Sequence, residues 1–316
     1  MQRLVYKLII AITVLSSGLS YALNQSCAIE YNRGNFDQAF ILCQAPAIAN
    51  DPVAQYNLAL MYYNGNGTAR DYTRALYWHN KALALNYAPA QYNEGIIYAR
   101  GLGVPKDYAK AAFWYQKAAN QNNADAQNNL AALYFKGLGV DQSYAIAKDW
   151  YFKAASLGNA KAEYNLGLMY AKGYGVEQDY SNAMYWYERS ANHGNLDAQN
   201  NLGVIFDEGV IVPQDKALAF SWYLKAATAN NAKAQTNLGY MYYTGNYVTQ
   251  SYSKALFWYQ KAAANGNDDA QLYLGLMYAN GIGVKKDLDT AMYWFNQSAS
   301  QGNIKAKYTL KEFSKN

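Results

Sequence analysis

The stretch AEYNLGLMYAKGYGVEQDYSNAMYWYERSANHGNLD, residues 162–197, decides the fold because it returns with changes along the chain. Copies begin at an alanine every 36 residues, and tryptophans recur with the same spacing. A fixed period of this size is typical of stacked supersecondary units. The complete copies begin at Ala54, Ala90, Ala126, Ala162, Ala198, Ala234 and Ala270.

Each copy is patterned as two helices, with positions counted from its first alanine. Apolar residues recur at spacings of three and four, which predicts two amphipathic helices and no strand. Glycine at position 12 suits the left-handed end of the first helix, and Asp or Ser at position 18 can cap the second. Gly or Asn at position 33 then ends the second helix.

Small residues at two positions indicate close packing between helices. Position 6 is Gly or Ala and position 22 is always Ala, so two helix backbones can approach closely while the tryptophan at position 25 fills the adjacent gap. Each helix pair leaves a face that only its neighbour can cover. We therefore predict an all-α fold: a right-handed α/α superhelix, or solenoid, of about seven 36-residue repeats with capping elements at both ends.

The residues of the repeat resemble a known family, the Sel-one-like repeat, which is related to the tetratricopeptide repeat. The resemblance covers the chain from Ala54 to the C-terminus and implies an α/α scaffold for protein partners, usually without catalysis. In the fourth copy the family pattern is matched by Ala162, Tyr164, Asn165, Leu166, Gly167, Met169, Tyr170, Gly173, Gly175, Val176, Asp179, Tyr180, Ala183, Trp186 and Tyr187.

The N-terminus is typical of an exported protein. Arg3 and Lys7 precede an apolar run, residues 8–15, and an A-x-A-like end at Ala22. This pattern predicts a secretory signal peptide over residues 1–22. The alternative, a permanent membrane anchor, is disfavoured because the run is too short to span a bilayer. We expect no stable membrane insertion after cleavage, and a periplasmic or secreted location.

The cysteines lie in the segment that would cap the first repeat. Cys27 and Cys43 are equally far from a predicted turn at Gly34 and Asn35, so on an antiparallel helix pair they would face each other. An oxidising compartment favours a disulfide between them. The alternatives, a metal site or a nucleophile, lack partners, because the chain has only two histidines. The predicted organisation is a signal peptide at 1–22, a capping helix pair at 23–53, seven repeats at 54–305 and a capping helix at 306–316.

Charge and motif content exclude several classes of function. The net charge is +5 and falls to +3 without Arg3 and Lys7, and no basic run indicates nucleic-acid binding. No Ser-His-Asp spacing is present, and the G-x-G-V loops follow helices without the Lys-Ser/Thr ending of a phosphate loop. We therefore expect no catalytic residue, no cofactor and no metal.

A few residues depart from the repeat. Glu94 stands at position 5, where the other six copies have leucine, and is expected to pair locally or to form a specialised pocket. His79 replaces an aromatic residue at position 26, and His193 stands at a helix end. Copies five and six lose the second loop glycine, and the end of the fifth first helix is acidic, which indicates specialisation there. The residues concerned are Ile211, Tyr247, Asp207 and Glu208.

The variable positions 3, 7, 10 and 11 of the first helix form the candidate binding groove. In related superhelices this face lines the concave side, and tyrosine is enriched in binding hot spots. The alternative is that some of these tyrosines pack between neighbouring repeats. The candidate groove residues are Tyr56, Leu60, Tyr63, Tyr92, Ile96, Arg100, Tyr164, Tyr240 and Tyr243.

The sequence thus favours an exported, monomeric repeat scaffold that binds a protein or peptide partner through a tyrosine-lined concave groove and is not an enzyme. Two alternatives stay open. One is a cell-envelope protein that binds or hydrolyses peptidoglycan or β-lactams, as the resemblance to cysteine-rich relatives implies. Those relatives carry a cysteine pair in most repeats, and none of the seven repeats here has one. The other is a secreted factor that engages host proteins.

Overall fold

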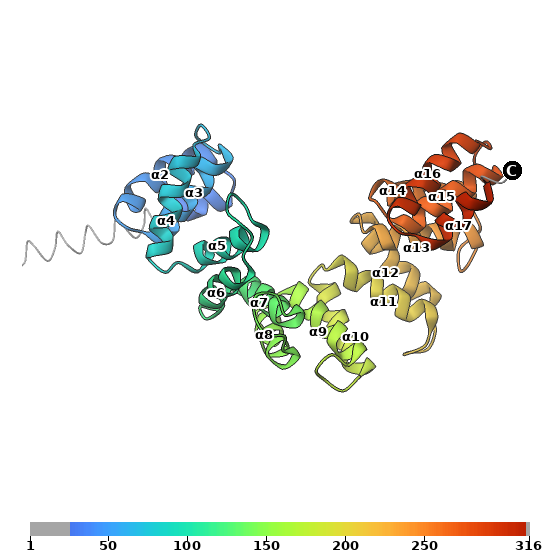
Figure 1. The fold of residues 1–316 in the computed structure, drawn as a ribbon, viewed down its shortest axis with the longest axis horizontal. Helices are drawn as coiled ribbons and strands as arrows, with labels where there is room; N and C mark the ends of the chain where they lie inside the picture. The colour runs from blue at the N-terminus through green and yellow to red at the C-terminus, as the bar shows by residue number, and fades with distance from the viewer. Residues whose placement is uncertain (1–25, 314–316) are drawn as a thin grey trace, which may run out of the picture. The chain divides into compact units, whose positions relative to one another are not determined.

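The computed structural model describes residues 26–313, which are helical throughout apart from turns and loops (Figure 1). The predicted signal peptide, residues 1–22, lies outside the described residues. Residues 26–32 are helical, and the chain then forms α2 (Phe36–Ile48), α3 (Pro52–Asn64), α4 (Tyr72–Ala84), α5 (Ala88–Arg100), α6 (Tyr108–Ala119), α7 (Ala124–Lys136), α8 (Tyr144–Ser156), α9 (Ala160–Lys172), α10 (Tyr180–Asn192), α11 (Leu196–Glu208), α12 (Lys216–Thr228), α13 (Ala232–Thr244), α14 (Tyr252–Ala264), α15 (Asp268–Asn280), α16 (Leu288–Ser300) and α17 (Ile304–Phe313).

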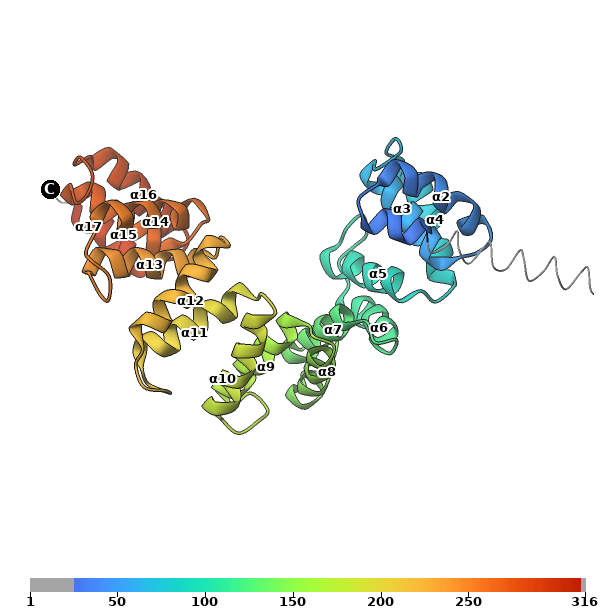
Figure 2. The ribbon, with the colours of Figure 1, turned by 180° about the vertical axis from the view of Figure 1, so that it is seen from behind.

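The chain divides into two compact units, with the boundary between Leu157 and Gly158. The first holds the N-terminal cap and repeats one to three, and the second holds repeats four to seven and α17. Within the second unit, α13 to α17 pack successively against one another, as Figure 2 shows from behind. The predicted all-α solenoid of helix pairs is confirmed.

The glycine and the Asp or Ser predicted at the helix ends terminate the first helix and cap the second helix of each repeat. At the end of α9, Gly173 has a φ of 70°, a left-handed conformation that residues with a side chain resist. The Asp179 carboxylate then accepts the backbone N–H of Asn182 at 3.0 Å and caps α10. The same glycine and the same Asp or Ser cap recur in all seven repeats.

The small residue at position 6 makes room for an aromatic ring. A Cβ added to Gly203 would lie 2.5 Å from the ring of Tyr223, the position-26 residue of the same repeat. The glycines of repeats two, four, six and seven meet a Tyr or Phe ring in the same way. The sequence suggested an approach of two backbones beside a gap-filling tryptophan. Instead the position-26 ring fills this space, and Trp186 is the only repeat tryptophan below one-tenth exposure, at 7%.

A glutamine side chain joins the first helix of most repeats to the helix before it, and we call this bond the glutamine stitch. In five repeats the position-2 glutamine donates its Nε2 to the backbone carbonyl eight residues earlier, as Gln199 does to Ala191 at 3.0 Å. These carbonyls lie at helix ends, where no intrahelical donor remains. Gln91 instead bonds to the side chain of Asn86.

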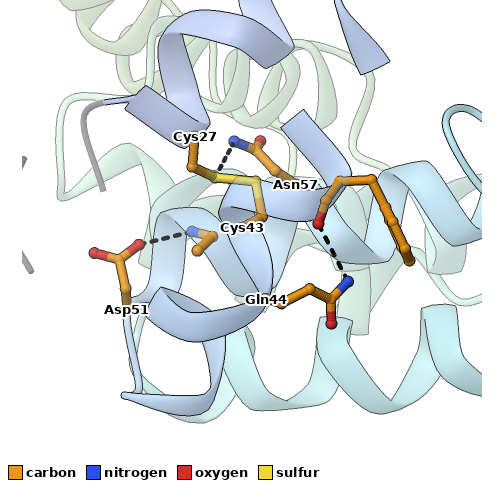
Figure 3. The surroundings of a disulfide bond; sticks show 7 residues. Cys27, Cys43, Gln44, Asp51 and Asn57 are labelled. Atoms are coloured by element: carbon orange, nitrogen blue, oxygen red, sulfur yellow. Dashed lines mark hydrogen bonds between the residues drawn. A yellow bond between two sulfur atoms is a disulfide. The ribbon is translucent and has the colours of Figure 1, made fainter. Parts of the chain in front are cut away.

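The N-terminal cap is held by the expected disulfide. Cys27 and Cys43 are joined, with their Cα atoms 5.0 Å apart, and both are fully buried (Figure 3). Their cluster includes Ala54 and Leu58 of the first repeat, so the cap covers that repeat's open face. At the other end of the described chain, Leu310 of α17 packs against the core of the seventh repeat.

Candidate binding surfaces

The position-3 tyrosines of the candidate groove join neighbouring repeats. The hydroxyl of Tyr56 accepts a hydrogen bond from Asn93 Nδ2 at 2.7 Å, and its ring lies edge-on to Tyr87 at 5.5 Å. Burial raises the pKa of Tyr56 to about 12. Tyr92 and Tyr164 are also half-buried and bond to Asn129 and Asn201, the matching asparagines of the next repeat.

The remaining groove candidates differ in exposure. Tyr63 is 57% exposed and Tyr240 is 48% exposed, and Arg100 also faces solvent. Tyr243 is half-buried and packs edge-on against Tyr252 at 5.4 Å. The aliphatic candidates Leu60 and Ile96 are half-buried. Ile96 packs against the core of the second and third repeats. On the first-helix face, Tyr63, Arg100 and Tyr240 are therefore the candidates that a partner could reach without repacking the repeats.

Two of the position-26 hydroxyls are met by an asparagine of the next repeat. Asn129 hydrogen-bonds Tyr115, and Asn201 hydrogen-bonds Tyr187. Each asparagine occupies position 4. A polar group buried beneath this face is thereby paired, which avoids a cost of about 1–3 kcal/mol.

The sixth repeat breaks this arrangement. Tyr259 is only 1% exposed, and its hydroxyl has no hydrogen-bond partner within residues 26–313. Position 4 of the next repeat is Tyr273, whose ring lies 5.3 Å from that of Tyr259. Burial raises the pKa of Tyr259, and the nearby Tyr273, Tyr243 and Tyr240 raise it further. We call these four residues the tyrosine cluster.

The junction between the first two repeats is polar where the others are apolar. His79 Nε2 lies 3.0 Å from Glu94 Oε2, and both side chains are largely buried. At four other junctions these two positions hold a buried Tyr and a buried Leu that share one core cluster, as Tyr223 and Leu238 do. The expected local pairing of Glu94 is thus what the structure contains, and His79, which the sequence presented as a packed aromatic substitute, is its partner.

The fourth repeat contains a buried ionic group that the sequence reading missed. Glu163 is fully buried at position 2, where the other repeats have glutamine. Its Oε2 lies 2.7 Å from His193 Nδ1, and its Oε1 forms a 3.0 Å ion pair with Arg189 Nη2. The signal was visible, because Glu163 is the only acid at position 2.

No cluster of three His, Cys, Asp or Glu residues within 26–313 could hold a metal ion. Over the same residues, every helix is too short or too polar to traverse a bilayer.

Comparison with known proteins identifies the repeats. The Sel1 repeat family matches residues 52–87, 88–123, 124–159, 160–195, 196–231, 232–267 and 268–303. The chain is 32% identical to a Sel1 repeat protein from Oxalobacter formigenes, with a TM-score of 0.71, over 77% of this chain and 99% of that one. No curated protein matches the chain.

A second similar structure is a protective antigen present in uropathogenic Escherichia coli strains, which displays an SLR fold. It is 36% identical with a TM-score of 0.71, and the match covers 86% of this chain but only 58% of the antigen. Sel1-repeat proteins generally act as scaffolds for protein partners and are generally not enzymes. With seven matched repeats and these two relatives, the chain belongs to the Sel1 repeat family.

Proposed function

We propose that this protein is an exported scaffold that binds a protein or peptide partner on the first-helix face of its repeats. The observation that carries the proposal is the tyrosine cluster. Its buried Tyr259 hydroxyl lacks a partner, while Tyr240 above the same core is half-exposed. The half-exposed Tyr240 ring of this cluster is accessible to a bound polypeptide, and tyrosine rings supply large contact areas with few rotors to immobilise.

Export is supported by two features of the N-terminal region. A disulfide persists in oxidising compartments and is rare in the bacterial cytosol, and Cys27 and Cys43 form one. Residues 1–22 carry the charge and apolar pattern of a signal peptide. The similar Escherichia coli protein is a protective antigen, which fits a protein that leaves the cytosol.

The proposal is tested by comparing variants as baits for the partner recovered from the cell envelope. Tyr240→Ala should keep the thermal melt and weaken partner binding by about 2 kcal/mol or roughly 30-fold. Tyr259→Phe should melt at a higher temperature, because it removes a buried hydroxyl without a partner.

Two controls separate binding from stability. Tyr185→Ala removes an exposed tyrosine from the second helix of its repeat, so partner binding should stay unchanged. Tyr56→Ala should lower the melting temperature, because the Tyr56 hydroxyl bonds to the next repeat. Equal loss of binding in Tyr185→Ala and Tyr240→Ala, or unchanged binding in Tyr240→Ala, would rule out the first-helix face as the binding surface.

A further inference from the structure

In the first, third and seventh repeats, a glycine at position 14 lets the interhelix loop press against the preceding helix pair. This glycine has a positive φ in all five repeats that carry it. A Cβ added in the first, third or seventh repeat would come closer than 3.0 Å to the residue that starts the helix before it, whereas Gly103 of the second repeat has no such atom within 4 Å. The glycines concerned are Gly67, Gly139 and Gly283. In those three repeats a side chain at this position would prevent the loop from closing against its neighbour.

The fifth repeat has Ile211 at this position, and its loop leaves a cavity. Ile211 is absent from the residues with positive φ, and the adjacent Val210 is 80% exposed. An open cavity of about 600 Å³ lies between this loop and the start of α10, within the second unit. It is lined by Tyr170, Glu177, Gln178, Asp179, Tyr180, Ser181, Val210 and Ile211, and we call it the loop pocket.

The sixth repeat shows that losing the glycine does not by itself open a cavity. Tyr247 keeps the positive φ, at 71°, and its ring lies 5.8 Å from that of Phe220 in the preceding second helix. The aromatic side chain thus takes up the space at that loop. The loop pocket accompanies Ile211, which, unlike Tyr247, does not adopt the left-handed conformation.

The lining of the loop pocket is acidic and apolar together. Glu177 and Asp179 contribute two carboxylates, and no Lys, Arg or His is among the lining residues. Hydrogen bonds from the backbone and side chain of Asn182 lower the pKa of Asp179, which keeps that carboxylate ionised. The start of α10 carries only about half a positive charge, so the local balance stays negative.

Nearby groups do not reverse this balance. Lys216, at the start of the next second helix, is paired with Asp207 at 2.6 Å. Gln178 donates to the Tyr180 hydroxyl at 2.9 Å, so that amide is also occupied. The apolar surface comes from Val210 and Ile211, and the cavity volume falls within the range of about 300–1,000 Å³ typical of ligand sites.

We propose that the loop pocket binds a lysine or arginine side chain of a protein partner, together with an adjoining apolar residue. The cationic head would face Glu177 and Asp179, and its aliphatic stem would lie along Val210 and Ile211. The argument is charge complementarity with an apolar wall beside it. The loop pocket shares no lining residue with the first-helix face, so this proposal stands or falls separately from the proposed function.

The purified protein is titrated with two capped tripeptides, acetyl-Leu-Arg-Leu-amide and acetyl-Leu-Glu-Leu-amide, by isothermal calorimetry at low salt. The arginine peptide should bind at least about tenfold more tightly than the glutamate peptide. Its affinity should fall as the salt concentration rises, because the Debye length shortens from about 10 Å at 0.1 M to about 3 Å at 1 M. Preference for the glutamate peptide, or no binding of either, would overturn the proposal.

Matched variants test whether the arginine peptide binds in the loop pocket. Glu177→Gln should weaken binding of the arginine peptide about two- to fivefold, the range of an exposed ion pair. Glu188→Gln removes the same charge from an exposed position of α10 that does not line the pocket, and should leave binding unchanged. Ile211→Gly should abolish binding by letting the loop close. Equal effects of Glu177→Gln and Glu188→Gln, or undiminished binding in both Glu177→Gln and Ile211→Gly, would show that the peptide binds elsewhere.

Discussion

His79 and Glu94 replace, as a pair, the aromatic and leucine residues that hold other repeats together, with 3.0 Å between the imidazole and the carboxylate. Each partner alone would leave a largely buried polar group facing an apolar neighbour, which costs about 1–3 kcal/mol. The two departures from the repeat therefore depend on each other.

A double-mutant cycle tests this dependence by urea unfolding. His79→Tyr and Glu94→Leu should each destabilise the protein by about 1–3 kcal/mol, because the remaining partner is left unpaired. The double variant restores the common pairing and should recover most of that loss. The third repeat accommodates Tyr151 with Ala131 at position 6, so Ala59 does not prevent the aromatic residue here. Additive single effects would contradict the pairing.

The buried carboxylate of the fourth repeat should depend on its two partners, His193 and Arg189, in the same way. His193→Ala leaves Glu163 buried with one partner fewer and should cost about 1–3 kcal/mol. The double variant Glu163→Gln, His193→Gln recreates the amide pair of the second repeat, where Gln121 Nε2 donates to Gln91 Oε1 at 2.8 Å. That variant should lie within about 1 kcal/mol of the parent in thermal unfolding. A double variant as unstable as His193→Ala would show that the ionic group is irreplaceable.

The disulfide should stabilise the N-terminal cap alone. Unreduced, denatured protein should give no free thiol by Ellman titration. Reduction should cost about 3 kcal/mol, as expected for a loop of about 15 residues. Hydrogen exchange should then speed up in α2 and α3 and stay unchanged in α15 and α16, which lie in the other unit. Uniform acceleration along the chain would show that the cap governs global stability.

Alkaline pH should unfold the protein through its tyrosines. Burial raises the pKa of Tyr56 to about 12, against about 10 for a solvated tyrosine, so the folded state favours the neutral phenol. This contribution to stability is complete below pH 10 and is lost as the pH rises from about 10 to 12. Melting temperatures should fall over that window, and absorbance at 295 nm should show a late-ionising fraction. A single ionisation near pH 10 with unchanged helicity would contradict this burial.

The sequence predicts most of the fold because its signals act within one repeat. Gly173 ends a helix and Asp179 starts the next through bonds that span a few residues. Groups that act between repeats were harder to interpret. Tyr56 resembles a groove residue until Asn93, 37 residues later, is seen to bond to it. The partner of Glu94 likewise belongs to the preceding repeat, so it could be named only once the register between repeats was known.

The candidate site likewise combines signals within one repeat, which the sequence shows, with contacts between repeats, which it does not. The unusual loop of the fifth repeat is evident from Ile211 in a glycine position, yet the cavity beside it depends on how the loop meets the neighbouring helix. Glu163 was overlooked because the role of position 2, a bond to a carbonyl eight residues earlier, is apparent only in three dimensions. A departure from the repeat can be found by comparing copies, whereas its consequence depends on the contacting copy.

The glutamine stitch at position 2 bears on how such a chain can change in length. Each of the five stitching glutamines bonds to a backbone carbonyl only eight residues earlier. Asparagine side-chain bonds such as that from Asn237 to Asn200 reach only the adjacent copy. Duplication or loss of a 36-residue segment would recreate the stitch at the new boundary. The number of repeats that carry only this bond can therefore change during evolution without leaving an unpaired glutamine or carbonyl. The His79–Glu94 pair needs the first and second repeats side by side, and the loop pocket needs the fourth and fifth. Selection for either feature would therefore keep those two repeats adjacent.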